Sequence, residues 1–159
     1  AGADPAAVYE IRAVDGSGNL SPPTATQAGP GPRIEVLDDR NPRFAMEGDW
    51  LGEELAPAHE GTLRVAGKAG AAFELKLTGR AVTWHSRLGA AGGQARIRID
   101  GKDAGTVSCY AADEIPAWPV FEHEWDKSGP HTIRVEVLGE PDARNGDTRV
   151  WLDAVSVCP

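Results

Sequence analysis

Trp118 is the side chain with the clearest binding chemistry in this sequence, because it lies on a predicted loop between Pro116 and Pro119. An aromatic ring at a protein surface can pack against the apolar face of a ligand, and planar polar side chains around it can hold the ligand's polar groups. A tryptophan on a loop of a rigid β scaffold therefore predicts a ligand site, although the same ring could instead fill the end of the scaffold. The polar partners expected around Trp118 are His85, Arg87, Asp113, Glu114, Arg144 and Asn145.

The sequence lacks the patterns that would indicate catalysis. Glu122-His123-Glu124 offers one histidine between two acids that alternate faces on a strand, so it is not the H-E-x-x-H zinc motif. No G-x-S-x-G elbow of a hydrolase, P-loop or dinucleotide fingerprint occurs. No spacing among the twenty-four acidic residues singles out a pair for glycoside hydrolysis. The sequence therefore favours a protein that is not an enzyme and requires no cofactor.

The two cysteines, Cys109 and Cys158, are too few for a zinc site, and the four histidines are scattered. A Cys109–Cys158 disulfide would close a loop of about 50 residues and stabilise the fold by roughly 4 kcal/mol. The alternative is a pair of free, half-buried thiols. We favour the disulfide because the composition is typical of a secreted protein.

The elements that must hold these side chains are short β-strands. In the stretch 81–110, Val82 and Trp84 alternate with Thr83 and His85, and turns rich in glycine separate three such segments, which indicates a β-meander. About nine strands with turns between them, and no convincing helix, indicate an all-β antiparallel sandwich or jelly roll. If each connection reverses the chain, one end of the sandwich carries the loops 67–70, 88–93, 111–119 and 140–148. The other end carries the turns 79–80, 101–103 and 127–130 and the connection 41–60.

The remaining tryptophans and several arginines have structural interpretations. The alternation in its strand predicts that Trp84 belongs to the core, and Trp125 and Trp151 are expected to pack on a sheet face. Trp50 is expected to anchor the long connection that precedes the second strand. Arg96, Arg98 and Arg134, interleaved with Glu136, are expected to form a solvated face of cross-strand charges, or alternatively to line a concave binding face.

The overall charge and length limit the classes of partner. Sixteen basic and twenty-four acidic residues give a net charge of −8, which disfavours nucleic-acid binding. No apolar run approaches the ~20 residues that span a bilayer, and no signal peptide is present, so we expect no membrane partner. The 159 residues suit one full domain with a fragment attached.

The beginning of the chain divides into a fragment and a linker. The run V-Y-E-I-R-A-V-D-G-S-G-N-L-S-P-P, from Val8 to Pro23, resembles the last strand pair of a fibronectin type III domain. Only the tail of such a domain is present, so residues 1–27 are interpreted as its C-terminal fragment. Gln27 to Pro32 is rich in proline and glycine, so residues 28–32 are expected to be a linker, followed by the main domain at 33–159.

The main domain carries motifs in a telling order. They are E-G-x-W from Glu47 to Trp50, V-T-W before the glycine-rich loop, A-x-I-x-I-D-G-K, G-x-H-T-I-R-V-E-V and V-W-L-D-A-V-x-V. From Arg33 to Val157 the chain resembles the galactose-binding-like jelly rolls, a family of carbohydrate-binding modules appended to secreted glycoside hydrolases and other polysaccharide-active enzymes. These motifs are mostly strand and turn positions, so they specify the fold better than the ligand.

The resemblance implies a secreted, non-catalytic module that binds a polysaccharide or glycan and keeps a linked catalytic domain near its substrate. The alternative is a structural or interaction module that packs against a catalytic domain and has no ligand of its own. The resemblance also implies a possible structural calcium near the pairing of the first and last strands. Its oxygen ligands would come from Glu35, Asp38 and Asp153, with Asp39 beside them, although the same acids could be surface charges.

Overall fold

The computed structural model describes residues 8–11, 24–27, 33–144 and 147–159. The chain forms two compact units, Ala1–Arg33 and Ile34–Pro159. In the first unit, β1 (Val8–Ile11) pairs antiparallel with β2 (Thr24–Gln27). The fibronectin-like motif of residues 1–27 falls largely outside the described residues, as does the linker 28–32, so both remain predictions.

The second unit is built from β-strands, and every pair of neighbouring strands in its sheets is antiparallel. Its strands are β3 (Glu35–Asp38), β4 (Phe44–Glu47), β5 (Leu51–Glu54), β6 (Thr62–Ala66), β7 (Ala72–Leu88), β8 (Gly93–Ile99), β9 (Lys102–Ser108), β10 (Ile115–Pro141), β11 (Val150–Leu152) and β12 (Ala154–Cys158). A 3₁₀ turn, η1 (His59–Gly61), is the one helical element in the described part of the chain. None of the described elements is a helix that could cross a membrane. The predicted all-β sandwich is confirmed.

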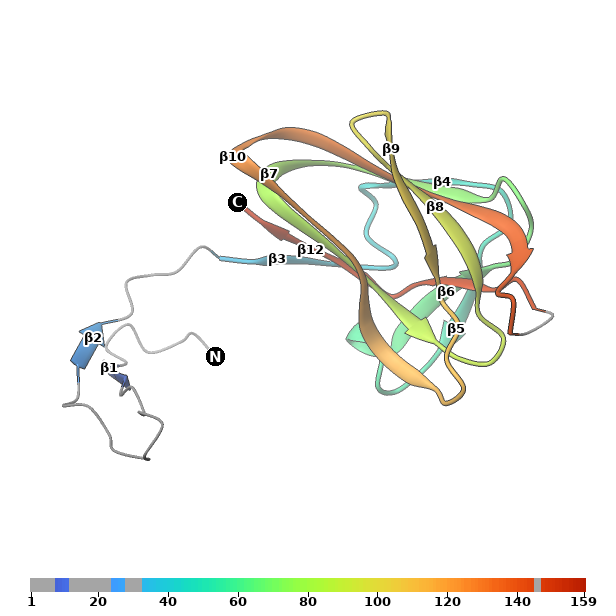
Figure 1. Cartoon of the computed structure of the whole chain (residues 1–159), viewed down its shortest axis with the longest axis horizontal. Coiled ribbons are helices and arrows are strands. Elements are labelled where there is room, and N and C mark those ends of the chain that lie inside the picture. Colours follow the sequence, from blue (N-terminus) through green and yellow to red (C-terminus); the bar gives the residue numbers. More distant parts are fainter. Residues whose placement is uncertain (1–7, 12–23, 28–32, 145–146) are drawn as a thin grey trace. The chain divides into compact units, whose positions relative to one another are not determined.

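The strands form a large sheet in the order β3-β12-β7-β10-β8-β9, with β4 also on β7, and a small sheet in the order β11-β6-β5. Within the large sheet, β7 and β10 pair along almost their whole length, from Ile115 opposite Leu88 to Glu136 opposite Ala72. Register shifts interrupt the pairing between Glu124 and Gly129, and Figure 1 shows this two-stranded ribbon bending sharply. The first half of β7 pairs with β4, and the second half pairs with β12.

The two halves of β7 face each other across the core. The rings of Phe73 and Trp84 are in edge contact with centroids 5.7 Å apart, although eleven residues of extended strand would separate them by roughly 36 Å. The buried positions also change parity at the bend, from Phe73 and Leu75 before it to Val82 and Trp84 after it. The bent ribbon therefore supplies one half of each strand to each layer of the sandwich.

The sequence pattern predicted shorter strands than the structure contains. We expected two strands at 72–79 and 81–88 and two more at 120–125 and 131–139, each pair joined by a turn. The structure has a single β7 and a single β10, because pairing continues on both sides of the bend. The expected long connection 41–60 contains β4 and β5, and Asp153 divides the expected last strand into β11 and β12.

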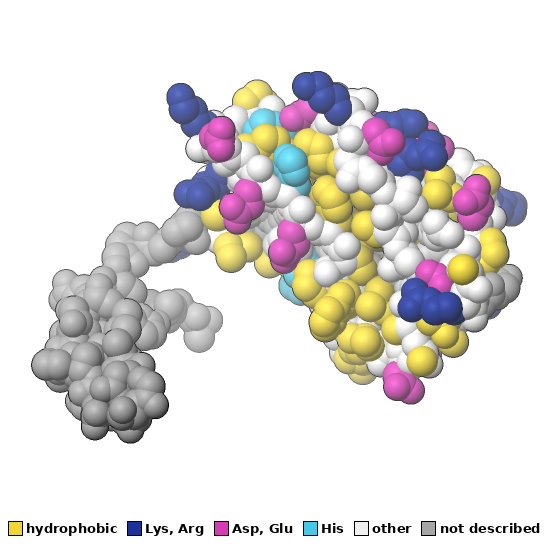
Figure 2. All heavy atoms as spheres, viewed as in Figure 1, with side chains coloured by type: hydrophobic (Ala, Val, Ile, Leu, Met, Phe, Trp, Pro, Cys, Tyr) yellow, Lys and Arg dark blue, Asp and Glu magenta, His cyan; other side chains and the backbone are white. Residues whose placement is uncertain are grey.

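The core contains Trp84, as the alternation predicted, and also Trp151, which we expected to pack on a sheet face. Trp84 and Trp151 are fully buried, and the Trp50 indole N–H donates to the carbonyls of Glu47 and Ala72, which anchors the long connection as expected. Figure 2 shows hydrophobic side chains gathered on the lower part of the second unit, where the small sheet and the start of β10 lie in Figure 1. Leu51 and Trp118, two of its exposed large hydrophobic residues, belong to these elements.

The predicted Cys109–Cys158 disulfide is wrong, because both cysteines are free thiols. Cys109 is buried beside Ser86, whereas Cys158 pairs with Ala81 in the β12–β7 ladder. Ser86 and Ala81 are five residues apart along one extended strand, or roughly 17 Å. A disulfide requires α-carbons within about 7 Å, so this fold keeps the two thiols too far apart.

Candidate functional site

The loops that we expected at one end of the sandwich do meet there. The Thr148 hydroxyl donates to the Gly67 carbonyl (2.8 Å), and the Gly93 amide donates to the Arg149 carbonyl (2.8 Å). The loop that follows β7 joins the loop that follows β9, because the Ala111 amide donates to the Gly89 carbonyl (3.1 Å). One end of the sandwich, which we call the loop end, is therefore formed by residue 67 and the segments 88–93, 109–119 and 147–149.

Trp118 lies at the loop end with its side chain open to solvent. It is the fourth residue of β10 and lies opposite Ser86 of β7, in a stretch where the register shifts on both sides. Ala117, directly before it, has a positive φ of 50°, which an alanine adopts only where surrounding structure imposes it. Trp118 is 47% exposed, so the chain holds a large aromatic side chain at the surface rather than in the core.

Arg87 provides a charged group at the loop end. It follows Ser86 on β7, forms an ion pair with Glu114 and lies 3.7 Å from a carboxylate oxygen of Glu53. Its guanidinium also lies 5.3 Å from the centre of the Trp151 ring, which fixes the side chain by a cation–π contact. The Arg87 Nε is buried without a hydrogen-bond partner among the described residues. The pair of Arg87 and Glu114 thus presents a fixed donor and a fixed acceptor at the loop end.

A second polar cluster forms around Arg144. Its guanidinium lies 4.4 Å from the centre of the Tyr110 ring and donates to Asp142, with Nε 2.6 Å from Oδ1. The Ser108 hydroxyl donates to the other Asp142 oxygen at 2.7 Å. The hydrogen bonds from Arg144 and Ser108 hold the pKa of Asp142 well below its usual range. Tyr110, Ser108 and Asp142 were not predicted, although the end of the expected strand 103–110 at the loop end could have indicated Tyr110.

Gly89 joins the two clusters. It forms an isolated bridge with Tyr110, and a β-carbon placed on it would lie 3.8 Å from the Glu114 Cγ. The Arg87–Glu114 pair and the Tyr110–Arg144 stack therefore both lie close to one glycine. With Trp118, the loop end offers two aromatic rings and several charged groups, a combination suited to a polyhydroxylated ligand.

Three predicted residues do not join these clusters. The His85 Nε2 lies 2.9 Å from the Ser156 hydroxyl of β12, so His85 is engaged on the outer face of the sheet rather than at the loop end. Asp113 lies in an exposed bend before β10 and contributes no described hydrogen bond or ion pair. Asn145 lies outside the described residues.

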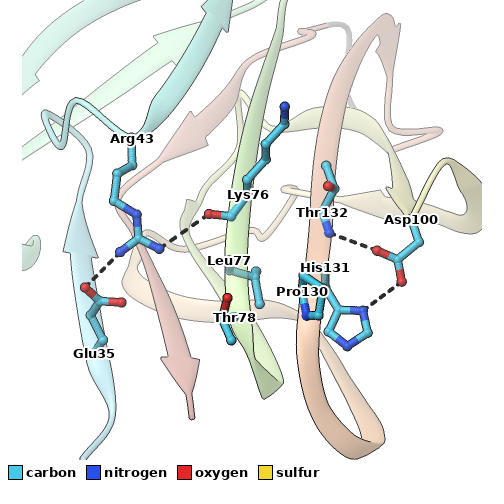
Figure 3. A pocket seen from close by; sticks show the side chains of 9 residues that line it. All are labelled: Glu35, Arg43, Lys76, Leu77, Thr78, Asp100, Pro130, His131 and Thr132. Carbon is cyan, nitrogen blue, oxygen red and sulfur yellow. Dashed lines mark hydrogen bonds and ion pairs between the residues drawn. The ribbon is translucent and has the colours of Figure 1, made fainter.

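The acids proposed for calcium separate into two places. Asp38 and Asp153 are close along the backbone, because Asp38 lies opposite Ala154 across the β3–β12 ladder. Both are buried, and each has one oxygen (Oδ2) without a partner among the described residues. Glu35, three residues before Asp38, instead pairs with Arg43 at 2.8 Å, as Figure 3 shows.

The carboxylates near Asp153 do not by themselves complete a calcium site. The ion takes six to eight oxygens, and the described residues contain no group of three or more histidine, cysteine, aspartate or glutamate side chains that could hold a metal. Arg40 already contacts Asp38 at 2.8 Å, and Arg64 lies 3.5 Å from Asp39, so arginines balance part of this charge. Calcium binding remains a prediction, and no part of the site described above depends on it.

A hollow of about 460 Å³ is bounded by β3, β7 and β10, and Figure 3 shows the side chains that line it. Most of its charged groups are paired with one another. Arg43 bridges Glu35 and the Lys76 carbonyl, and His131 pairs with Asp100 at 2.9 Å. With these groups paired among themselves, the hollow offers a ligand few free partners, and we assign it none.

Comparison with known proteins places this fold among carbohydrate-active proteins. No protein-family model matches the chain. The A type blood alpha-D-galactosamine galactosaminidase of Flavonifractor plautii is 26% identical over 113 residues, which are 71% of this chain and 10% of that enzyme. The CBM36-1 domain of a multidomain xylanase from the hindgut metagenome of Trinervitermes trinervoides has a TM-score of 0.53 at 10% identity, covering 80% of this chain and 98% of that domain. A GH87 alpha-1,3-glucanase catalytic domain in complex with nigerose has a TM-score of 0.50 at 13% identity, covering 80% and 28%.

These likenesses establish a β-sandwich shared with carbohydrate-binding and glycoside hydrolase-related domains. The chain spans about a tenth of the galactosaminidase and under a third of the glucanase chain, so it corresponds to one part of each. It corresponds to nearly all of the CBM36 domain. Because the set contains both a binding domain and catalytic domains, the absence of catalysis in this chain remains a prediction.

Proposed function

We propose that this chain is a non-catalytic carbohydrate-binding module whose loop end binds glycan. The observation that carries the proposal is Trp118, a large aromatic side chain held 47% exposed at the loop end, which also carries the Arg87–Glu114 pair. Trp118 packs against the C–H face of a sugar ring, while Arg87 and Glu114 donate to and accept from its hydroxyls. The Tyr110–Arg144 stack close to Gly89 offers a second place for a neighbouring sugar.

The setting of the module is part of the same proposal. It belongs to a secreted enzyme and keeps a linked catalytic domain close to its polysaccharide by raising the effective concentration. The names of the similar proteins support this setting, because a xylanase, an α-1,3-glucanase and a galactosaminidase all act on glycans. The rival function is a structural module in which Trp118 seals the end of the sandwich against a neighbouring domain.

A glycan-binding screen of the purified chain and its Trp118→Ala variant tests the proposal. The panel includes xylo-oligosaccharides, nigerose and its longer homologues, and α-galactosaminides. We expect selective binding by the native chain and a loss of about 30-fold or more in the affinity of the variant's loop end, since truncation of a central aromatic residue costs about 2 kcal/mol or more. Circular dichroism and the melting temperature should be unchanged, because nearly half of Trp118 is already exposed.

Ile34→Ala is the matched control, because Ile34 is also an exposed hydrophobic residue, at 62%, but lies beside β3. It should leave both binding and stability unchanged. A structural module would behave differently, with no binding by the native chain and a lower melting temperature for Trp118→Ala alone.

A further inference from the structure

A groove of about 630 Å³ lies away from the loop end. One wall is the turn between β8 and β9, from Ile99 to Ala104, and the other is the stretch Phe121–Trp125 of β10. Phe121 and His123 lie opposite Trp84 and Val82 of β7, so they face the core side of their layer. In the described ladders β8 pairs with β10 only from Ile133 onward, which leaves this part of β10 as an edge strand.

Aromatic rings form a continuous row along the groove. The rings of Phe121 and His123 are parallel within 4°, with centroids 6.4 Å apart. The Trp125 ring contacts His123 edge-on at 4.7 Å and stacks on His131 at 3.7 Å. Each of these side chains keeps some exposure to solvent, while Phe121 and Trp125 also pack against the core.

The end of the row next to Trp125 is held in place by the polar pair of His131 and Asp100. The His131 Nδ1 lies 2.9 Å from one Asp100 oxygen, and the Thr132 amide donates to the other at 2.9 Å, both visible in Figure 3. His131 therefore cannot turn away from Trp125 without breaking its contact with Asp100. Rigid rings lose little conformational entropy when a ligand packs against them, which favours binding.

The rim of the groove supplies groups for hydroxyls. Lys102 is exposed, with no hydrogen bond or ion pair among the described residues, and the Asp103 carboxylate and the His123 ring lie beside it. One Asp103 oxygen accepts from the Gly105 amide at 2.9 Å, which fixes the direction of the carboxylate. Parallel rings bordered by a cationic donor and a carboxylate acceptor are the combination that recognises a sugar ring.

The other occupants of an edge groove are disfavoured by the strand itself. Glu122 and Glu124 on this part of β10, Pro116 and Pro119 at its start and the irregular stretch after Glu124 are features that prevent a further strand from pairing. A second copy of the chain is therefore a poor fit to this edge. The net charge of −8 also opposes a nucleic-acid strand.

We propose that the groove between the β8–β9 turn and residues 121–125 is a second glycan-binding site, which receives one or a few sugar units independently of Trp118. The inference rests on the proposed carbohydrate-binding function. It makes the module bivalent, so that two weak contacts with one polysaccharide raise its overall affinity.

The test uses Ala104→Trp, which places a large ring in the groove at an exposed position and removes none of its aromatic residues. Thr106→Trp is the matched control, since Thr106 is equally exposed on β9 but does not line the groove. Binding of xylohexaose, nigero-oligosaccharides and α-galactosaminides is measured by calorimetry in the native chain, in both β9 variants, and in each variant combined with Trp118→Ala. A Lys102→Ala variant provides a second change that leaves the packing untouched.

We expect Trp118→Ala to keep binding at reduced stoichiometry, and Ala104→Trp to weaken that remaining binding about tenfold or more. Thr106→Trp should change it less than about twofold, and Lys102→Ala should weaken it in the same direction as Ala104→Trp. If Trp118→Ala abolishes all binding and Ala104→Trp leaves the native stoichiometry unchanged, the second site is refuted and the loop-end site stands. If the native chain binds no glycan, the proposed function fails and the groove assignment fails with it.

Discussion

At the scale of single residues, burial changes the acidity of the Cys109 thiol. It is fully buried, with its sulfur 3.6 Å from the Ser86 hydroxyl, which itself donates to the Trp151 carbonyl. Burial raises the pKa of the Cys109 thiol to about 11, because the thiolate would lose its hydration. Cys158 is only partly buried at the end of β12.

We therefore predict that a thiol reagent such as Ellman's modifies one cysteine per native chain at pH 8, since the thiolate is the reactive form. Two should react once guanidinium unfolds the protein without added reductant. In a Cys158→Ser variant the native count should fall to zero. If the unfolded, unreduced chain gave no reactive thiol, the cysteines would be joined after all.

Residue types and their spacing identified part of the site. The order of strands brought Arg87, Glu114 and Trp118 to one end, because strand ends and loops follow from alternation and turn residues. The same reasoning included His85, whose outward position is shared with Arg87, but could not reveal that His85 forms a hydrogen bond with Ser156 of a distant strand. Tyr110 and Asp142 were missed because their partners come from loops whose approach depends on tertiary packing.

At the scale of elements, the bend of the β7–β10 ribbon determines the architecture. Gly79 lies at this bend opposite Gly129. A β-carbon on Gly79 would come 2.5 Å from the Cys158 carbonyl oxygen and 2.9 Å from a Val157 methyl group, so only glycine lets β12 pass. A β-carbon on Gly129 would meet His131 Nε2 at 3.5 Å, an ordinary contact.

Gly79→Ala should therefore destabilise the fold by about 1–3 kcal/mol, the usual cost of overpacking a well-packed site. Gly129→Ala is the matched control from the opposite strand and should change stability by much less. Urea unfolding of both variants measures the difference. Equal midpoints for the two variants would show that β12 does not constrain the bend.

Glycine and proline at the bend also explain why the sequence predicted two short strands in place of each of β7 and β10. Gly79 and Pro130 normally indicate turns in a sequence, and a turn is a local reversal. Here both strands bend together and keep pairing, so the residues mark a change of layer within two long strands. A local pattern cannot distinguish these cases, because the difference lies in the partner strand about 50 residues away.

At the scale of the whole molecule, the free energy of unfolding should depend on pH through two acids, Asp153 and Asp142, whose pKa values folding shifts in opposite directions. Asp153 is fully buried between β11 and β12, where its Oδ1 accepts from the His59 amide at 2.8 Å. Burial raises the pKa of the Asp153 carboxyl, and the nearby charge of Asp39 raises it further. The pKa of Asp142 is lowered by Arg144 and Ser108.

These two shifts have opposite signs in the free energy of unfolding. A raised carboxyl pKa means that the folded state keeps a proton that the unfolded chain releases near pH 4. The contribution of Asp153 is therefore present below about pH 4 and is lost as the pH rises through its folded pKa. Asp142 contributes above about pH 4, and its contribution is lost as the pH falls.

We predict that Asp153→Asn gains stability relative to the native chain as the pH rises above about 4, by about 1.4 kcal/mol for each unit by which folding raises the Asp153 pKa. The asparagine carbonyl keeps the acceptor for the His59 amide, so the fold is retained. Urea unfolding from pH 3 to 8 in the presence of EDTA measures the difference and prevents a divalent cation from neutralising Asp153. Asp142→Asn is the control, and its stability should fall less than that of the native chain as the pH is lowered below about 4. Parallel profiles for Asp153→Asn and the native chain would contradict this prediction, because they would mean that folding leaves the Asp153 pKa unchanged.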